Sequence, residues 1–153
     1  METLQKHKHQ RQKMIERENL SPAELRRIEN YRNRYMKMAK EVFENKVRYY
    51  INLTGGEYKR ISVRDQKTRW GSCSSNGTLS FNYRLLFAPV KCLDYVVVHE
   101  LCHLTHMNHS KEFWNKVAEV MPDYKEPRKW LKDHGNELSV EAHLKKQGIS
   151  LKI

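Results

Sequence analysis

The feature that most constrains the fold is the run His99-Glu100-Leu101-Cys102-His103, which directly follows the apolar run Tyr95-Val96-Val97-Val98. On an α-helix, residues four apart project from one face about one turn apart, so both imidazoles can reach one metal ion. Glu100 lies beside the first histidine, where its carboxylate reaches a water on the metal rather than the metal itself. The run therefore predicts a buried helix that carries a metal site, and the alternative is a buried helix that merely contains two histidines.

A third histidine ligand is available at position 106 or 109. On a continuous helix, His106 would lie ~7.5 Å along the axis from the midpoint of the first two histidines, at ~1.5 Å per residue. His109 reaches the metal if the helix stops near 105–107, and His106 and Asn108 tolerate the left-handed conformation that such a break needs. The resulting spacing equals that of the metzincin motif, although a histidine stands where that motif has glycine. We therefore favour His109 as the ligand and expect His106 at the helix end or the pocket rim.

Three imidazoles leave a fourth coordination position for water, which is the arrangement of catalytic zinc sites. We expect one Zn²⁺ per chain, held by His99, His103 and His109. Glu100 would take the proton of the zinc-bound water and pass it to the leaving group. The spacing does not identify the side chain that stabilises the developing oxyanion. The candidates are Tyr83, Arg84, Tyr124 and His134.

Length and cysteine content limit the class of protein. A chain of 153 residues is enough for one domain with a modest core. We expect a polar segment over 1–20, as a frayed helix or without fixed structure, and a single domain over 21–153. No run approaches the ~20 apolar residues that span a bilayer, and three irregularly spaced cysteines do not form a disulfide framework. We therefore expect a cytoplasmic protein that has no membrane partner, with Cys102 buried; the sequence does not indicate an oligomeric state.

The net charge of +11 favours an acidic partner, such as a nucleic acid or a nucleotide. The basic residues are spread through 26–48 and 111–146 and alternate with acids, rather than forming one run. This spread is typical of a solvated surface, so we expect nucleic-acid binding to be weak at most.

The order of predicted elements is α+β. Ser21-Pro22-Ala23-Glu24 predicts the start of a long helix, and Thr54-Gly55-Gly56 its end. A strand is expected at 61–63, and two more at 69–74 and 78–83, on either side of the turn dipeptide Asn76-Gly77. Together these strands predict a small antiparallel sheet of about three strands. The metal helix should then run from Pro89 to about 105, followed by helices from Ser110, over 127–134 and over 137–146.

Several longer stretches resemble a known family. They are Arg69-Trp70-Gly71-Ser72-Cys73-Ser74, Phe81-Asn82-Tyr83-Arg84-Leu85, Ala88-Pro89, Asp94–Leu104, Asn108-His109-Ser110 and Phe113-Trp114. From about Ile61 to Gly135 the chain resembles the YgjP-like metallopeptidase domain, which is related to the SprT-like and WLM zinc peptidases. The resemblance implies a zincin-like minimal fold, zinc at the positions of His99, His103 and His109, and Glu100 as the catalytic base. Names given to such proteins range from zinc metallopeptidase and metal-dependent hydrolase to nucleoside triphosphate pyrophosphatase.

The leading hypothesis is therefore a zinc-dependent hydrolase, namely a metallopeptidase. One alternative keeps the metal site but acts on nucleoside triphosphates, and another is a nucleic-acid-associated protease or binding module. Residues 70–72 should form a strand beside the metal helix, where an extended peptide can pair with its edge. Arg69 and Arg84 could instead hold a phosphate. The candidate substrate-binding residues are Arg69, Tyr83, Arg84 and Tyr124.

Overall fold

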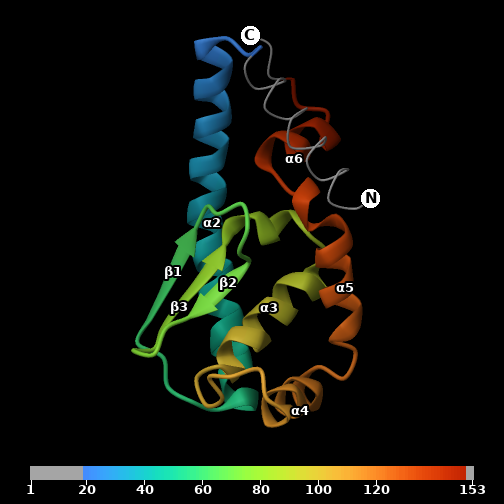
Figure 1. The fold of residues 1–153 in the computed structure, drawn as a ribbon. Helices are drawn as coiled ribbons and strands as arrows, with labels where there is room; N and C mark the ends of the chain where they lie inside the picture. Colours follow the sequence, from blue (N-terminus) through green and yellow to red (C-terminus); the bar gives the residue numbers. More distant parts are fainter. Residues whose placement is uncertain (1–18, 151–153) are drawn as a thin grey trace.

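The computed structural model describes residues 19–150, so most of the polar segment predicted over 1–20 lies outside the described residues. Figure 1 shows a sheet on one side of the molecule and α3 in the middle, next to α2, α4 and α5. This arrangement is the expected α+β fold. The elements in chain order are α2 (Pro22–Thr54), β1 (Arg60–Arg64), β2 (Gly71–Cys73), β3 (Thr78–Asn82), the 3-10 helix η1 (Tyr83–Phe87), α3 (Val90–Cys102), α4 (Lys111–Val120), α5 (Lys125–His134), the 3-10 helix η2 (Gly135–Glu137) and α6 (Val140–Lys146).

The long helix α2 has the boundaries that its sequence predicts. The Ser21 hydroxyl accepts a hydrogen bond from the Glu24 backbone N–H at 3.1 Å, which satisfies a donor that the first turn leaves free. At the other end, Gly55 adopts φ 75°, a conformation that glycine takes without steric cost. Between these caps, the buried face of α2 packs on the sheet, where Phe43 stacks on Phe81 with ring centroids 4.7 Å apart.

The three-stranded sheet is mixed, which corrects the prediction of an antiparallel sheet. The expected hairpin forms, so β2 and β3 are antiparallel, but β1 pairs with β3 in parallel and the strand order is β1-β3-β2. The connection over 65–70 passes the end of β3, because Arg64 at the end of β1 pairs with Asn82 and Gly71 at the start of β2 pairs with Phe81. It is held there by the Asn82 side-chain amide, which donates to the carbonyls of Gln66 and Arg69. As a result the buried strand β3 is central, and β2 is an edge strand.

The helix α3 is buried on nearly all sides, as expected for a helix that is apolar all round. It packs against α2, β2, α4 and α5, and Cys102 is buried as predicted. The helix ends at Cys102, earlier than expected, and the chain continues through hydrogen-bonded turns from His103 to His106. Its buried residues are Cys92, Leu93, Tyr95, Val96, Val97, Val98, Glu100, Leu101 and Cys102.

A polar contact fixes α3 against α2. The Tyr50 hydroxyl donates to Asp94 Oδ2 at 3.0 Å, and Lys46 Nζ lies 2.9 Å from Asp94 Oδ1. Burial, followed by the charge of Asp94, raises the pKa of Tyr50 well above its ordinary value, so the hydroxyl stays a donor. Because the partners come from two helices, the contact sets how α3 lies along α2.

Of the C-terminal helices, α4 and α5 pack on α3, and α6 packs on α2. Ser110 caps α4 by accepting from the Phe113 N–H at 3.3 Å, as predicted, and α5 begins two residues before the predicted Pro127. The last helix is α6, capped by Ser139, and it packs on α2 through Val140 and Leu144. Within residues 19–150, no helix is long and apolar enough to cross a membrane.

The Asp94 contact yields a stability prediction. Replacing Asp94 by alanine leaves Tyr50 and Lys46 without their acceptor, so we expect the free energy of unfolding to fall by about 2 kcal/mol. Urea denaturation at neutral pH measures this change. The control is Asp123→Ala, which breaks only the exposed pair with Lys91 at 2.8 Å and should leave stability near that of the parent. Equal losses in both variants would show that the Asp94 contact does not hold the two helices together.

Candidate metal centre

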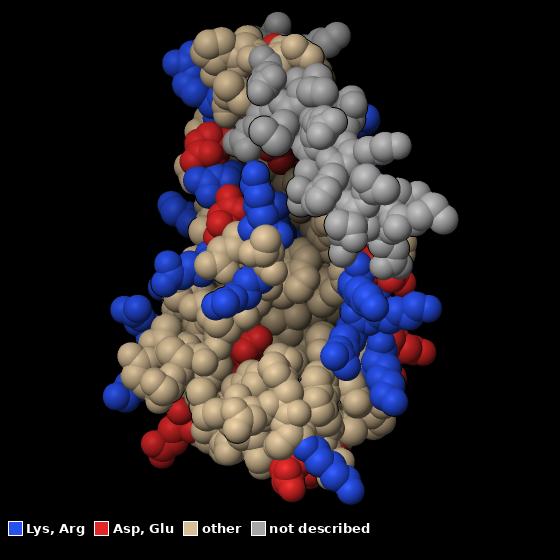
Figure 2. Space-filling view, viewed as in Figure 1, with Lys and Arg blue, Asp and Glu red and all other residues tan. Residues whose placement is uncertain are grey.

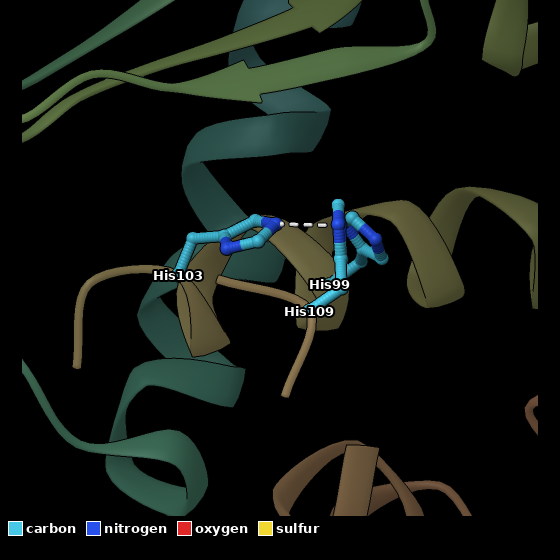
Figure 3. A group of neighbouring side chains, drawn as sticks. All are labelled: His99, His103 and His109. Atoms are coloured by element: carbon cyan, nitrogen blue, oxygen red, sulfur yellow. Dashed lines mark hydrogen bonds between the residues drawn. The ribbon is translucent and has the colours of Figure 1, made fainter. Parts of the chain in front are cut away.

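Three histidines converge where α3 ends. His99 lies on α3, His103 directly follows its last residue, and His109 lies in the loop before α4. Each offers one ring nitrogen, and these nitrogens lie within 4.8 Å of one another. Figure 3 shows the three side chains gathered at one place. His103 Nε2 and His109 Nε2 are 3.1 Å apart. The three side chains could therefore hold one metal ion.

The loop after α3 orients His103. Its Nδ1 lies 3.0 Å from the backbone carbonyl of His106, so Nδ1 carries the donated proton and Nε2 is left facing His109. The side chain of His106 instead contacts the Thr105 hydroxyl at 2.9 Å. The left-handed residue expected at 106 or 108 does not occur, because the positive φ angles between residues 19 and 150 all belong to glycines.

Aromatic side chains of α4 pack against the three imidazoles. The ring of Phe113 stacks on His103 with centroids 4.4 Å apart and meets the ring of His99 edge-on at 5.0 Å. Trp114 stacks on His109 at 5.8 Å. Because Phe113 is fully buried, these contacts leave the imidazoles little freedom to rotate. Trp114 packs against the hydrophobic core and also forms a wall of the site.

Glu100 is buried beside the three histidines. Its Oε2 is 3.2 Å from His99 Nδ1, and its side chain is only 7% exposed. Across from it, β2 approaches so closely that a Cβ on Gly71 would lie 3.0 Å from Glu100 Cγ and 3.1 Å from Oε2. A glycine inside a strand often marks a close approach, so Gly71 is the one local signal of this contact.

The edge of β2 borders Glu100. β2 pairs with β3 on one side only, and Ser72 lies opposite Ser80 in that antiparallel ladder. Because backbone groups alternate between the two sides of a strand, the N–H and C=O groups of Gly71 and Cys73 face away from β3. The strand predicted beside the metal helix therefore offers free backbone donors and acceptors there.

A stack of aromatic rings forms the wall toward α5. Tyr124 stacks on Trp114 at 5.3 Å and on Tyr95 at 6.4 Å. The Arg128 guanidinium carbon lies 4.6 Å from the centre of the Trp114 ring. Burial raises the pKa of Tyr95 to about 12, and the charge of Arg128 acts in the opposite direction. Arg128 was not among the candidates from sequence, because an exposed arginine on a basic helix has no distinguishing pattern.

The other candidate substrate residues are placed differently. Tyr83 is buried in the core, which raises its pKa to about 12. Arg84 Nε forms an ion pair with Asp65 at 3.1 Å, and Arg69 is exposed at the start of β2. Of the four candidates, Tyr124 is therefore the one whose ring belongs to a wall of the histidine site.

Comparison with known proteins agrees with this geometry. A family model described as YgjP-like, metallopeptidase domain matches residues 2–134. Among solved structures, the crystal structure of the metallopeptidase zymogen of Pyrococcus abyssi, abylysin, is 26% identical with a TM-score of 0.52. The similarity covers 59% of this chain and 93% of that chain. No curated protein matches the chain. A metallopeptidase implies a metal ion, and the three histidines are positioned to bind one.

The electrostatics of the histidine cluster yield a prediction for the metal-free protein. Desolvation, followed by the charges of His103 and His99, lowers the pKa of His109 below the ordinary 6.5. We therefore expect His109 to stay neutral, the form that binds metal, at a pH where an isolated imidazole is partly protonated. NMR titration of the metal-free chain, with the resonance assigned through His109→Gln, measures this pKa. A value above 6.5 would mean that the neighbouring charges do not act on His109 as described.

Proposed function

The chain belongs to the YgjP-like metallopeptidase family, and on that premise we propose that it is a zinc-dependent peptidase. The observation that carries the proposal is the convergence of nitrogens from His99, His103 and His109 within 4.8 Å beside a buried Glu100. We also propose that residues 21–153 act as one catalytic domain.

The donor set suits zinc. Zn²⁺ is a borderline-soft ion, and three neutral imidazoles with one position left open are its usual catalytic ligands. The His106 carbonyl accepts from His103 Nδ1, which is the kind of outer contact that orients a ligating histidine. A cation here would also offset the charge of the Glu100 carboxylate, which has little contact with solvent. The residues thus fit the ion that we propose.

The chemistry follows from the positions of the side chains. When bound, Zn²⁺ would polarise the scissile carbonyl and acidify a water molecule. We propose that Glu100 accepts a proton from the attacking water and delivers it to the leaving amine. Its shielded position beside Gly71 and His99 keeps the carboxylate in one orientation for both transfers.

An extended peptide fits the edge of β2. The backbone groups of Gly71 and Cys73 could pair with the main chain of a substrate, as in peptides that add a strand to a sheet. Because Gly71 lies directly against Glu100, a peptide held there would pass close to the carboxylate. This pairing needs no particular substrate side chain, so it favours unfolded segments of proteins.

The structure does not favour the nucleotide alternative. Arg84, one of the two arginines considered for phosphate binding, is already ion-paired with Asp65. Basic and acidic side chains are interspersed over the α2 side of the molecule (Figure 2). Among the described residues, the α2 side therefore has no basic stripe for a nucleic acid, and the exposed basic residues of α5 lie on the other side of the molecule, near the histidine site.

Metal binding provides the first test of the function. We expect the purified protein to hold about one equivalent of zinc, because three imidazoles form a single site. His99→Ala and His103→Ala should abolish this binding, and His109→Ala should weaken it severely, as measured by metal analysis and calorimetry. His106→Ala is the matched control, since it keeps the backbone carbonyl that orients His103. If His106→Ala loses the metal and His109→Ala keeps it, the assignment of the third ligand is wrong.

Replacing Glu100 separates chemistry from binding. Glu100→Gln should keep the zinc and the fold but lower the cleavage rate at least about 100-fold, because an amide cannot accept a proton from water. Mass spectrometry of a digested, denatured protein substrate measures the rate. Cleavage by Glu100→Gln at the parent rate would exclude the proposed base.

Gly71→Ala supplies a graded comparison for the same assay. The added Cβ would crowd Glu100 at 3.0–3.1 Å, so the carboxylate must shift by a small distance. Since small displacements of a reacting group slow catalysis sharply, we expect about a tenfold loss of rate with zinc retained. An unchanged rate would show that the position of Glu100 relative to β2 is not important.

A further inference from the structure

We propose that Arg128 binds a carboxylate of the peptide substrate beside the metal centre, an inference that rests on the peptidase function proposed above. The carboxylate is either the C-terminal carboxylate of the peptide or an Asp or Glu side chain. Arg128 is thereby a specificity-determining residue.

The first observation is where the guanidinium lies. It is 4.6 Å from the centre of the Trp114 ring, a cation–π distance. That ring stacks on His109 at 5.8 Å and on Tyr124 at 5.3 Å. The Trp114 ring therefore contacts both the guanidinium and His109, a proposed metal ligand. Its stacking on Tyr124 restricts the movement of the ring against which Arg128 packs.

The second observation is that Arg128 has no carboxylate partner within residues 19–150. The ion pairs formed there use Arg32, Arg84, Lys46, Lys91 and Lys116 as their lysine and arginine members. Arg128 makes its contact with an aromatic face instead, and within residues 19–150 the N–H donors at the edge of the guanidinium have no hydrogen-bond partner. A guanidinium with its N–H donors available is suited to a carboxylate, which it binds through two parallel hydrogen bonds.

The third observation is the charge around Arg128. Lys and Arg side chains gather on the α5 side of the molecule, and the surface between the sheet and α5 is hollowed (Figure 2). The end of α5 also meets the start of β2, because Gly135 packs directly against Trp70. A peptide along β2 would thus lie in a hollow that has a basic border. The exposed basic residues of α5 are Lys125, Arg128, Lys129 and Lys132.

A carboxylate fits Arg128 better than the reacting carbonyl does. The indole of Trp114 lies against both the guanidinium and His109, so the guanidinium is beside the centre rather than over it. Successive residues of an extended peptide are about 3.3 Å apart, and a group one or two residues from the scissile bond would reach this position. Arg128 therefore selects the substrate rather than stabilising the charge that develops during cleavage.

Binding to an inactive chain tests the proposal without relying on cleavage. Zinc-loaded Glu100→Gln protein is titrated into fluorescently labelled peptides. The peptides share one sequence except at a single Asp or Asn position, and their C-termini are either free or amidated. One peptide has Asp and an amidated C-terminus, another has Asn and a free C-terminus, and a third has Asn and an amidated C-terminus. We expect at least one of the first two to bind about tenfold more tightly than the third, as a charge-assisted bidentate contact allows. The tighter of the two identifies the source of the carboxylate.

The decisive comparison is between two arginines. Arg128→Gln, made in the Glu100→Gln chain, should remove the preference for the carboxylate peptide. Arg34→Gln is the matched control, because Arg34 lies over Tyr31 at 5.3 Å in the same kind of contact on α2, and it should keep the preference. Arg128→Lys keeps the positive charge but not the planar guanidinium, so this variant should retain only part of the preference for the carboxylate peptide. A preference that survives Arg128→Gln, or is absent from the start, would overturn the proposal.

Cleavage mapping gives a second and separate readout. With Glu100 intact, the parent should cut denatured proteins near acidic residues or near their C-termini, and Arg128→Gln should cut at sites without this bias. If the parent cuts no protein, the peptidase proposal fails, and the peptide titration still decides whether Arg128 binds carboxylates.

Discussion

The positions of the histidines and of Glu100 depend on the burial of α3. The helix is apolar on nearly all sides and packs against α2, β2, α4 and α5. This packing fixes the direction in which His99 and Glu100 leave the helix. The turns after Cys102 then return the chain, so that His109 meets His103. The histidine site is made from one helix and the loop that follows it, and the elements packed around α3 hold that helix in one orientation.

The sheet contributes the unpaired edge of one strand, β2, to the surroundings of the histidine site. Because β1 pairs with the far side of β3, β2 keeps one edge unpaired among residues 19–150, and the face of β2 lies against Glu100 at Gly71. An antiparallel sheet with the strands in chain order would have placed β2 in the centre, with both sides paired. The mixed order therefore explains how so small a sheet can offer an unpaired strand edge near the histidine site.

Local signals in the sequence predicted much of the fold and the core of the candidate site. Ser21 and Gly55 mark the ends of α2, Asn76-Gly77 marks the hairpin, and the spacing of the histidines led to the cluster that the structure brings together. What the sequence did not predict depends on long-range packing. Local patterns do not say on which side of the hairpin β1 pairs, or that the His106 carbonyl orients His103. Nor do they distinguish Arg128, which is set apart only by its place over Trp114.

In the function proposed for this chain, three histidines hold one zinc ion while Glu100 remains free to act as a base. X-ray absorption spectroscopy at the zinc edge of the loaded protein tests this most directly. We expect three imidazole nitrogens at about 2.0–2.1 Å and one light oxygen ligand. A sulfur ligand at about 2.3 Å, or fewer than three imidazoles, would contradict the account, because the metal would then be bound by side chains other than those that converge at the end of α3.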